Sequence, residues 1–306
     1  MIYTLTTNPA VDLNVISNSI QPGVVNRTFS PIYTANGKGI NVSFVLKHFG
    51  VDSHILGFFG GFTGRYIVEE SEKKGVHVIP VWVDDTTRIN IFLNDGEKEF
   101  KFVNEGALVT RQQENEMLEL IQNLEDMTYL TVNGSLSKGM DEEFYERLMK
   151  VCKQKKVKVI LDISSNKLKE LMRYQPYLIK PNDEEIQSIF GIAMRNETDI
   201  INVLHNLYEE GAQNILLTLG DRGSYFYNGR NIYFTSAQPV KLLSSACAGD
   251  SALAAFLSIW IFEQEKLEDA LKLSAATGAN VAESNAIGDL KKVEQYIKNI
   301  KVRKVE

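Results

Sequence analysis

The chain has 306 residues, of which 44% are hydrophobic and 24% charged, a composition typical of globular proteins and unlike that of disordered, collagen-like or disulfide-stapled chains. A formal net charge of -6 argues against a general nucleic-acid-binding protein, because the phosphate backbone binds to basic surfaces. Two cysteines, no signal-peptide pattern and no apolar run of roughly 18 residues indicate a cytoplasmic protein with no membrane partner.

Short apolar, β-branched runs alternate along the chain with longer amphipathic stretches. After a short strand and turn over 1–9, the predicted strands in chain order are 54–59, 76–83, 127–132, 157–162, 177–180 and 214–219. The predicted helices are 41–49, 66–74, 111–124, 141–154, 183–190, 198–210, 250–263, 267–283 and 290–299. This alternation predicts an α/β fold with a mostly parallel sheet that helices cover on both faces.

Two stretches, 11–33 and 87–103, depart from this rhythm, because each indicates strands in polar alternation with no helix between them. Residues 94–96, with the sequence Asn-Asp-Gly, are typical of a hairpin turn. No repeat or low-complexity linker divides the chain, so we expect one folding unit over 1–306. Its small second sheet would take strands from about 11–36 and 86–106 and would serve as a lid.

The segment 244–251 is a run of small residues that leads directly into the apolar residues 252–257. Free N–H groups and the positive end of the dipole make a helix start an anion site, suited to a phosphoryl group in transfer. A carboxylate at that start, Asp250, could take a proton from an acceptor hydroxyl. The alternative is that Asp250 only caps a buried helix.

A second cluster places Gly37 and Gly39 around Lys38, just before an apolar helix, which suits a backbone turn around a polar ligand. It lacks the spacing of a P-loop, and a tight turn with a solvated lysine is the alternative. The glycines of 57–64 resemble a dinucleotide loop, but their spacing is wrong for one. A nucleotide-dependent oxidoreductase is therefore a disfavoured rival.

Lys180, Asn182 and Glu185 follow a strand and begin a helix, at the edge of an open sheet where ligands bind. Carboxylates there could hold magnesium through water, or could only favour the helix dipole. The glycine turn 220–223 suits nucleotide phosphates or a plain hairpin. Arg27, Arg88 and Lys38 could bind a substrate phosphate, although each could equally be a surface charge. The four histidines have no metal-binding spacing.

Taken in order, these motifs resemble those of the PfkB carbohydrate-kinase family, also called ribokinase-like, over essentially the whole chain. The segments that carry the resemblance are 7–12, 37–41, 87–90, 133–136, 179–182 with Glu185, and 248–251. The resemblance implies a three-layer ribokinase-like fold with a β-sheet lid, ATP and Mg²⁺ as cofactors, and a homodimer contact through the lid. Within the family, 8–12, 25–27 and 37–41 look like the branch of 1-phosphofructokinases and tagatose-6-phosphate kinases.

That resemblance implies roles for individual residues. Asp250 would be the general base, with the N–H groups of Cys247, Ala248, Gly249 and Asp250 as an anion hole. Residues that would bind the sugar phosphate are Asp12, Arg27, Gly37, Lys38, Gly39, Asn41, Arg88, Asn90 and Ser135. Residues that would face ATP are Lys180, Asn182, Thr218, Gly220, Gly223, Gly249 and Asn280, with Glu185 ordering Mg²⁺ through water. The implied reaction is the ATP-dependent conversion of fructose 1-phosphate to fructose 1,6-bisphosphate.

Three positions depart from the family pattern: Cys247 and Asn36 stand where glycine is usual, and Phe92 where this branch often has lysine. Because a side chain disfavours positive φ, we expect Cys247 to adopt an ordinary backbone conformation. Substrate preference is the property that these changes are most expected to alter. Tagatose-6-phosphate kinase is therefore the alternative activity, and a sugar-phosphate sensor without catalysis is a remote one.

Overall fold

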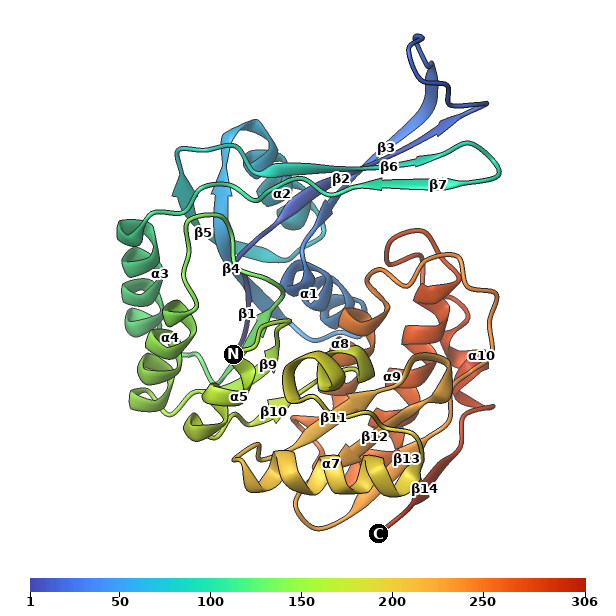
Figure 1. The fold of residues 1–306 in the computed structure, drawn as a ribbon. Helices are drawn as coiled ribbons and strands as arrows, with labels where there is room; N and C mark the ends of the chain where they lie inside the picture. Colours follow the sequence, from blue (N-terminus) through green and yellow to red (C-terminus); the bar gives the residue numbers. More distant parts are fainter.

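A computed structural model describes residues 1–306 and shows two sheets, of which the larger has ten strands (Figure 1). Seven of these are parallel: β11 (Ile215–Thr218), β10 (Leu178–Ile179), β9 (Lys158–Asp162), β8 (Tyr129–Asn133), β1 (Ile2–Thr6), β4 (Ser53–Gly60) and β5 (His77–Val83). Three antiparallel strands extend the β11 edge: β12 (Ser224–Tyr227), β13 (Ile232–Thr235) and β14 (Val302–Lys304). The predicted mostly parallel sheet is confirmed.

Helices cover both faces of this sheet, which gives three layers. One face carries α1 (Lys38–His48), α2 (Gly61–Lys73), α8 (Ala248–Trp260), α9 (Leu267–Ala282) and α10 (Val293–Ile297). The other carries α3 (Arg111–Asn123), α4 (Glu143–Gln154), α5 (Leu168–Leu171) and α7 (Glu197–Glu209). None of the helices combines the length and apolar character that crossing a bilayer requires.

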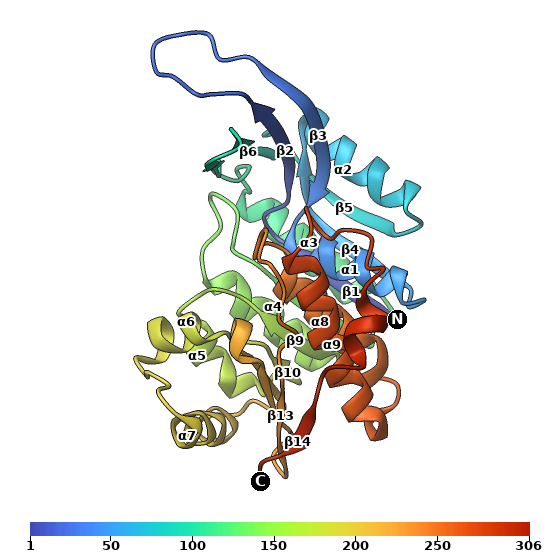
Figure 2. The ribbon, with the colours of Figure 1, turned by 90° about the vertical axis from the view of Figure 1, so that its right-hand side faces the viewer.

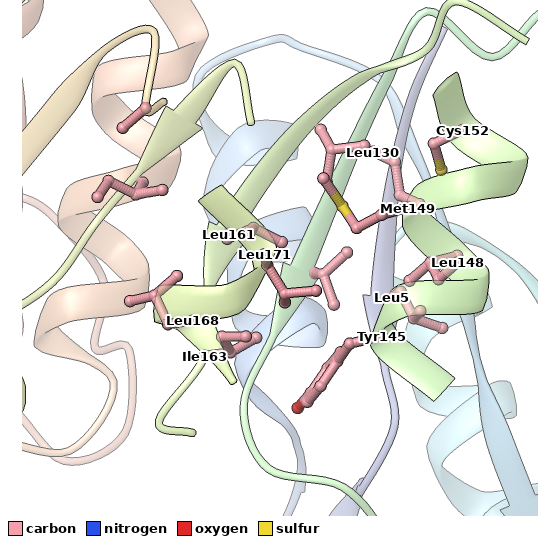
Figure 3. Close-up of a cluster of buried hydrophobic side chains, with 14 of the residues drawn as sticks. Leu5, Leu130, Tyr145, Leu148, Met149, Cys152, Leu161, Ile163, Leu168 and Leu171 are labelled. Atoms are coloured by element: carbon pink, nitrogen blue, oxygen red, sulfur yellow. The ribbon is translucent and has the colours of Figure 1, made fainter. Parts of the chain in front are cut away.

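The buried strands supply both cores because successive side chains point to opposite faces. In β11, Ile215 and Leu217 belong to the core under α7, whereas Leu216 packs on the α8 side. Figure 3 shows part of the core on the face that carries α3, α4, α5 and α7. There Leu5, Leu130 and Leu161 of neighbouring strands pack against α4 and α5. All of these leucine side chains are buried, so the central sheet is a rigid support for whatever its edge presents.

The smaller sheet has four strands in the order β3 (Thr28–Asn36), β2 (Ala10–Ser17), β6 (Arg88–Asn94) and β7 (Glu99–Phe102). β2 and β6 are parallel and the two outer pairs are antiparallel, with the predicted turn between β6 and β7. In Figures 1 and 2 this sheet projects from the body beyond α1 and α2. The two stretches that broke the helix–strand rhythm therefore form a separate sheet, as predicted.

Several elements differ from the prediction: α2 begins five residues earlier than expected, α10 is shorter than the predicted 290–299, and α5 was not predicted. The predicted helix 183–190 is one short turn, α6 (Asp183–Glu185), followed by a wider turn over Ile186–Phe190. The helix predicted from 250 begins two residues earlier, at Ala248. Strands β13 and β14 were not predicted, because each is short, with four and three residues, and only β14 lies at the edge of the sheet.

Candidate active site

The start of α8 presents unpaired backbone N–H groups at the carboxyl edge of the sheet. Cys247 precedes the helix with φ of 64°, which turns the chain so that the first helical N–H groups point outward. The N–H groups of Cys247, Gly249 and Asp250 donate no hydrogen bond, and that of Ala248 reaches the Ser245 carbonyl only at 3.4 Å. The small residues of 244–249 leave room in front of these donors, which is the geometry of an anion site.

The conformation of Cys247 corrects the expectation that a cysteine here requires an ordinary φ. The left-handed turn forms without glycine. A left-handed conformation costs a side-chain-bearing residue roughly 1–2 kcal/mol, which the surrounding structure must offset. The Cys247 Sγ contributes one contact, because it accepts a hydrogen bond from Asn41 Nδ2 at 3.3 Å.

Asp250 lies in the first turn of α8 and is not its cap, since Cys247 occupies the capping position and no side chain caps the helix. Its Oδ2 accepts a hydrogen bond from Asn41 Nδ2 at 3.0 Å. Its Oδ1 accepts none and is not sealed from solvent. Burial, and then the charge of Asp162, raise the pKa of Asp250 to about 6, against the opposing effects of Lys38, Asn41 and Lys180. One oxygen is therefore fixed and the other is free to take a proton.

Asp12 and Asn90 pair across β2 and β6 of the small sheet. Asn90 Nδ2 donates to Asp12 Oδ1 at 2.9 Å, and Asn36 Nδ2 donates to Asp12 Oδ2. Burial raises the pKa of Asp12, although both amides and Arg88 act in the opposite direction. Asn36 Oδ1 in turn accepts from Asn41 Nδ2 at 2.9 Å, so a continuous chain of hydrogen bonds leads from the small sheet to Asp250.

Gly37 and Gly39 allow α1 to begin against the end of β1. A Cβ at Gly37 would lie 2.6 Å from Thr6 Cγ2, and one at Gly39 would lie 2.5 Å from Thr6 Oγ1. Gly37 also has φ of 153°, which disfavours a side chain. The two glycines thus bring Lys38 and Asn41 close to the ends of β1 and β8, where ligands of open sheets bind.

Lys180 and Lys38 share one buried carboxylate, Asp162. Lys180 Nζ lies 3.0 Å from Asp162 Oδ1, and Lys38 Nζ lies 3.8 Å from the same atom. Burial opposes ionisation, but the two ammonium groups outweigh it and hold the pKa of Asp162 below its ordinary value. A Cβ at Gly249 would lie 3.4 Å from Lys180 Nζ, so the ammonium group faces the start of α8. Its charge adds to the anion site there.

Asn182 and Glu185 form a reciprocal cap at the start of α6. Asn182 Oδ1 accepts from the Glu185 N–H at 2.7 Å, and Glu185 Oε2 accepts from the Asn182 N–H at 3.0 Å. Ser164 Oγ donates to Glu185 Oε1 at 2.6 Å. Both oxygens of Glu185 thus have partners, and no group of three potential ligands gathers into a metal-binding cage.

The turn between β11 and β12 lies next to this cap, because Asn182 and Thr218 form a parallel bridge. Gly220 and Gly223 have φ of 60° and 91°, and a Cβ at Gly223 would lie only 2.2 Å from the Thr235 carbonyl oxygen. Asn280 is buried, and its Oδ1 accepts from the Lys292 N–H at 2.9 Å. The side chain of Asn280 therefore joins α9 to the start of α10.

Arg88 and Ser135 lie near Asn8, at the base of the small sheet. Arg88 donates to the Asn104 and Asn8 carbonyls at 3.1 and 3.2 Å, and its buried Nε has no partner. Asn8 Nδ2 donates to the Ser135 hydroxyl at 3.4 Å. Arg27, by contrast, lies at the far end of the β2–β3 ribbon, next to the Ser17–Thr28 pair, where its carbonyl accepts from the Ser17 hydroxyl. Within one chain, Arg27 is separate from the other candidate residues.

Two residues of this site were not predicted to be functional. Asp162 ends the predicted strand 157–162, and a carboxylate at the carboxyl end of a buried strand was the available signal. Asn36 was recognised only as a departure from glycine. Its two hydrogen-bond partners, Asp12 and Asn41, come from different elements, which the sequence does not place together.

Comparisons with known proteins agree with this arrangement. The family model described as pfkB family carbohydrate kinase matches residues 6–292. A D-tagatose-1-phosphate kinase of Klebsiella oxytoca is 44% identical over 302 residues, 99% of each chain. A 1-phosphofructokinase of Bacillus subtilis is 33% identical over the whole of both chains. The structure of phosphofructokinase-2 of Escherichia coli with fructose 6-phosphate superposes with a TM-score of 0.87 and 25% identity, covering 97% of this chain and 99% of that one.

The order of motifs, the three-layer fold with its small sheet and the match along nearly the whole chain all lead to one assignment. The chain belongs to the pfkB family of carbohydrate kinases.

Proposed function

We propose that this kinase transfers the γ-phosphoryl group of ATP to the C6 hydroxyl of a ketohexose 1-phosphate, converting fructose 1-phosphate to fructose 1,6-bisphosphate. The observation that carries the proposal is the position of the free Asp250 Oδ1 beside the unpaired N–H groups of Cys247, Gly249 and Asp250. A proton acceptor and an anion site at one helix start are what an in-line phosphoryl transfer to a hydroxyl requires.

In this mechanism Asp250 accepts the proton of the C6 hydroxyl as its oxygen attacks the γ-phosphorus. A pKa of about 6 leaves most of the carboxylate ionised at neutral pH and keeps it basic enough to act. The N–H groups at the start of α8 and the Lys180 ammonium group would stabilise negative charge on the phosphoryl oxygens. These groups are fixed before the reaction, so little reorganisation opposes it.

The sugar phosphate would lie between the small sheet and α1. Asp12 and Asn41 suit hydroxyl groups, since Asn41 contacts Asp250 and Asp12 is linked to Asn41 through Asn36. Arg88, Lys38 and Ser135 suit the phosphate at the other end of the sugar, with Asn90, Gly37 and Gly39 lining the same space. Arg27 could join them only by a movement of the ribbon or from a second copy of the chain, because it lies at the far end of the β2–β3 ribbon.

ATP would lie along the ends of β10 and β11, next to Lys180, Asn182, Thr218, Gly220, Gly223 and Gly249, with Asn280 fixing the wall formed by α9. Mg²⁺ bound with the nucleotide would neutralise phosphate charge. Glu185 fits a contact to that ion through water, because Mg²⁺ keeps several waters and takes few carboxylates. Direct coordination fits less well, since both oxygens of Glu185 already accept hydrogen bonds.

The small sheet would act as a lid over the sugar phosphate. It contributes Asp12, Asn36 and Asn90 to the site, so its position and the order of the site are linked. Closure would depend on the bound sugar phosphate and would exclude water, so that ATP is not hydrolysed in place of the transfer.

D-Tagatose 1-phosphate is the second candidate substrate, because the Klebsiella oxytoca relative named for it is 44% identical to this chain. Tagatose differs from fructose only in the configuration at C4, so the same base and anion site serve both sugars. Tagatose 6-phosphate, the alternative from the sequence, would instead receive its phosphoryl group at C1.

A coupled ADP-release assay with ATP and Mg²⁺ tests the proposal across fructose 1-phosphate, tagatose 1-phosphate, tagatose 6-phosphate, fructose 6-phosphate and unphosphorylated sugars. We expect the highest kcat/KM with a ketohexose 1-phosphate. If the chain binds a sugar phosphate but phosphorylates none of these sugars, it is a sugar-phosphate sensor and not a kinase. A preference for a 6-phosphate would contradict the placement of the substrate phosphate.

We also propose that two copies of the chain associate in the cytoplasm through their small sheets. Apolar side chains that are exposed on this sheet and its loops include Ile16, Val24, Val25, Phe29, Ile32, Tyr33, Phe102 and Val103. Grouped exposed apolar residues favour a protein contact. Light scattering should give twice the mass of one chain for the native protein and a single-chain mass for Ile32→Lys. A single-chain mass for the native protein would reject the dimer.

A further inference from the structure

Asn36 is the last residue of β3, and both ends of its amide are engaged. Its Nδ2 donates to Asp12 Oδ2 in β2. Its Oδ1 accepts from Asn41 Nδ2 in α1 at 2.9 Å and from the Gly37 N–H at 2.6 Å. The side chain therefore connects the small sheet to the helix that supports the base.

The bond to Asn36 fixes the direction of the Asn41 amide. The Asn41 NH₂ group has two hydrogens, and its nearest acceptors are Asn36 Oδ1 at 2.9 Å and Asp250 Oδ2 at 3.0 Å. Because an amide is planar, an N–H held by Asn36 sets the direction of the second N–H. That second N–H points at Asp250 Oδ2 and so leaves Oδ1 as the free oxygen. Cys247 Sγ, at 3.3 Å, is the weaker competitor for the same group.

The same side chain fixes Asp12. Each Asp12 oxygen accepts from one amide, Asn36 on β3 and Asn90 on β6, so the carboxylate is held from the two strands that flank β2. The carboxylates of Asp12 and Asp250 are therefore linked through two hydrogen-bonded amides, those of Asn36 and Asn41. A sugar that contacts both would meet them at a set separation.

We propose that Asn36 is a positioning residue: it orients Asn41, and through Asn41 the carboxylate of Asp250, in register with Asp12 on the small sheet. The proposal rests on the proposed function for the roles of Asp250 and Asp12, but the link from Asn36 to Asp250 is a property of the free protein. The alternative is a purely local role for Asn36, in which its side chain would only hold the turn at Gly37.

Titration of the Asp250 carboxyl carbon by ¹³C NMR in the full chain tests this link without any substrate. The signal is assigned by its loss in Asp250→Asn. In Asn36→Ala we expect the midpoint to rise on the order of one pH unit, because the ionised carboxylate loses a fixed donor. The other groups that face Asp250, namely Asp162, Lys38, Lys180 and Cys247, stay in place. Asn123 is exposed at the end of α3, so Asn123→Ala is the matched control and should leave the titration midpoint of Asp250 unchanged.

The decisive comparison uses Asn41→Ala. If Asn36 acts through Asn41, then Asn36→Ala adds no further shift in an Asn41→Ala chain. An unchanged midpoint in Asn36→Ala, or an equal shift with and without Asn41, overturns the proposal. Asn36→Ser, whose hydroxyl is too short to reach Asn41, repeats the test should the alanine variant unfold.

Activity gives an independent readout. We expect Asn36→Ala to lower kcat about tenfold while the KM for ATP stays the same, as a misplaced base would. If the native chain turns over no ketohexose 1-phosphate while the NMR midpoint still shifts, the proposed function fails and the link stands. If turnover is normal and the midpoint does not move, the link fails and the function stands.

Discussion

Asn41 Nδ2 lies 3.0 Å from Asp250 Oδ2, while Oδ1 of the same carboxylate accepts no hydrogen bond. A carboxylate held by one oxygen has a defined direction in which it can take a proton. The same contact favours the ionised form, and so limits a rise in pKa that burial and Asp162 would otherwise increase. Asn41 thus keeps Asp250 both oriented and ionised near neutral pH.

The first prediction concerns the acid side of the pH profile. With the pKa of Asp250 at about 6, kcat should decline as pH falls below 6, because the protonated acid cannot accept the hydroxyl proton. Lys38 lowers this pKa by its charge, so Lys38→Met should move the decline to higher pH. Free substrate phosphates titrate in the same range, but identically in the assays of both proteins. An unmoved profile in the variant, measured from initial rates between pH 5 and 8, would contradict the assignment.

The second prediction concerns stability. The pKa of Asp250 is raised by folding from 3.8 to about 6, so protonation favours the folded state below 3.8 and this contribution is lost as pH rises through 6. The difference corresponds to roughly 3 kcal/mol at most. Asp250→Asn, neutral and of the same shape, should therefore unfold a few degrees higher than the native chain at pH 7.5 but not at pH 3.5.

Thermal unfolding measured by circular dichroism at the two pH values checks this prediction. Asp84→Asn is the control, because Asp84 is exposed and makes no ion pair, and it should change neither temperature. A lower unfolding temperature for Asp250→Asn at pH 7.5 would mean that the carboxylate stabilises the fold, against the burial argument. The same variant should lose a hundredfold or more in kcat.

The third prediction concerns Arg88, a half-buried guanidinium group that forms no ion pair and whose Nε has no partner. Burial lowers the pKa of Arg88, which indicates a cation that lacks compensation in the free protein. The phosphate group of the substrate would supply the missing negative charge. Arg88→Lys loses the planar, bidentate donor set, so the KM for the sugar phosphate should rise about tenfold or more and the KM for ATP should not. Arg195→Lys, on an exposed loop, should leave both constants unchanged, and equal constants in Arg88→Lys would exclude a phosphate contact.

The fourth prediction concerns the left-handed Cys247. Glycine adopts φ of 64° without a steric penalty, so Cys247→Gly should keep kcat within a few-fold and raise the free energy of unfolding by up to about 1 kcal/mol. Cys247→Val, with a β-branched side chain, should destabilise the protein and disrupt the anion site. Urea denaturation of the native chain and the two variants measures the three free energies of unfolding. Equal stability of the valine and glycine variants would show that the turn relaxes.

Much of the fold followed from the sequence, because hydrophobic periodicity is strong where strands are buried on both faces. The strand predicted at 157–162 and the helix predicted at 111–124 are found within one residue of their predicted ends. The small sheet was predicted because its polar alternation and its Asn-Asp-Gly turn have no helix beside them. The strands β13 and β14 lack such a signal, since each is too short to show a clear period.

The site was less predictable, because its properties depend on contacts between distant segments. Asp162 ends a predicted strand, but only the structure brings Lys38 and Lys180 to it. Asn182 and Glu185 have the spacing of a capping box, a signal that was present in the sequence and went unused. Whether Arg27 reaches the substrate phosphate stays a prediction, because it depends on where the ribbon moves.

The parallel pairing of β2 with β6 has a consequence for how the chain folds. Asp12 and Asn90 are 78 residues apart in sequence, and β1, α1, β4, α2 and β5 are formed by the chain between and before them. Closing so long a loop is favourable only after the intervening core has brought the two strands together. During synthesis, therefore, the β2–β3 ribbon emerges well before β6, and the small sheet that carries Asp12 is completed only after α1, β4, α2 and β5 have packed together.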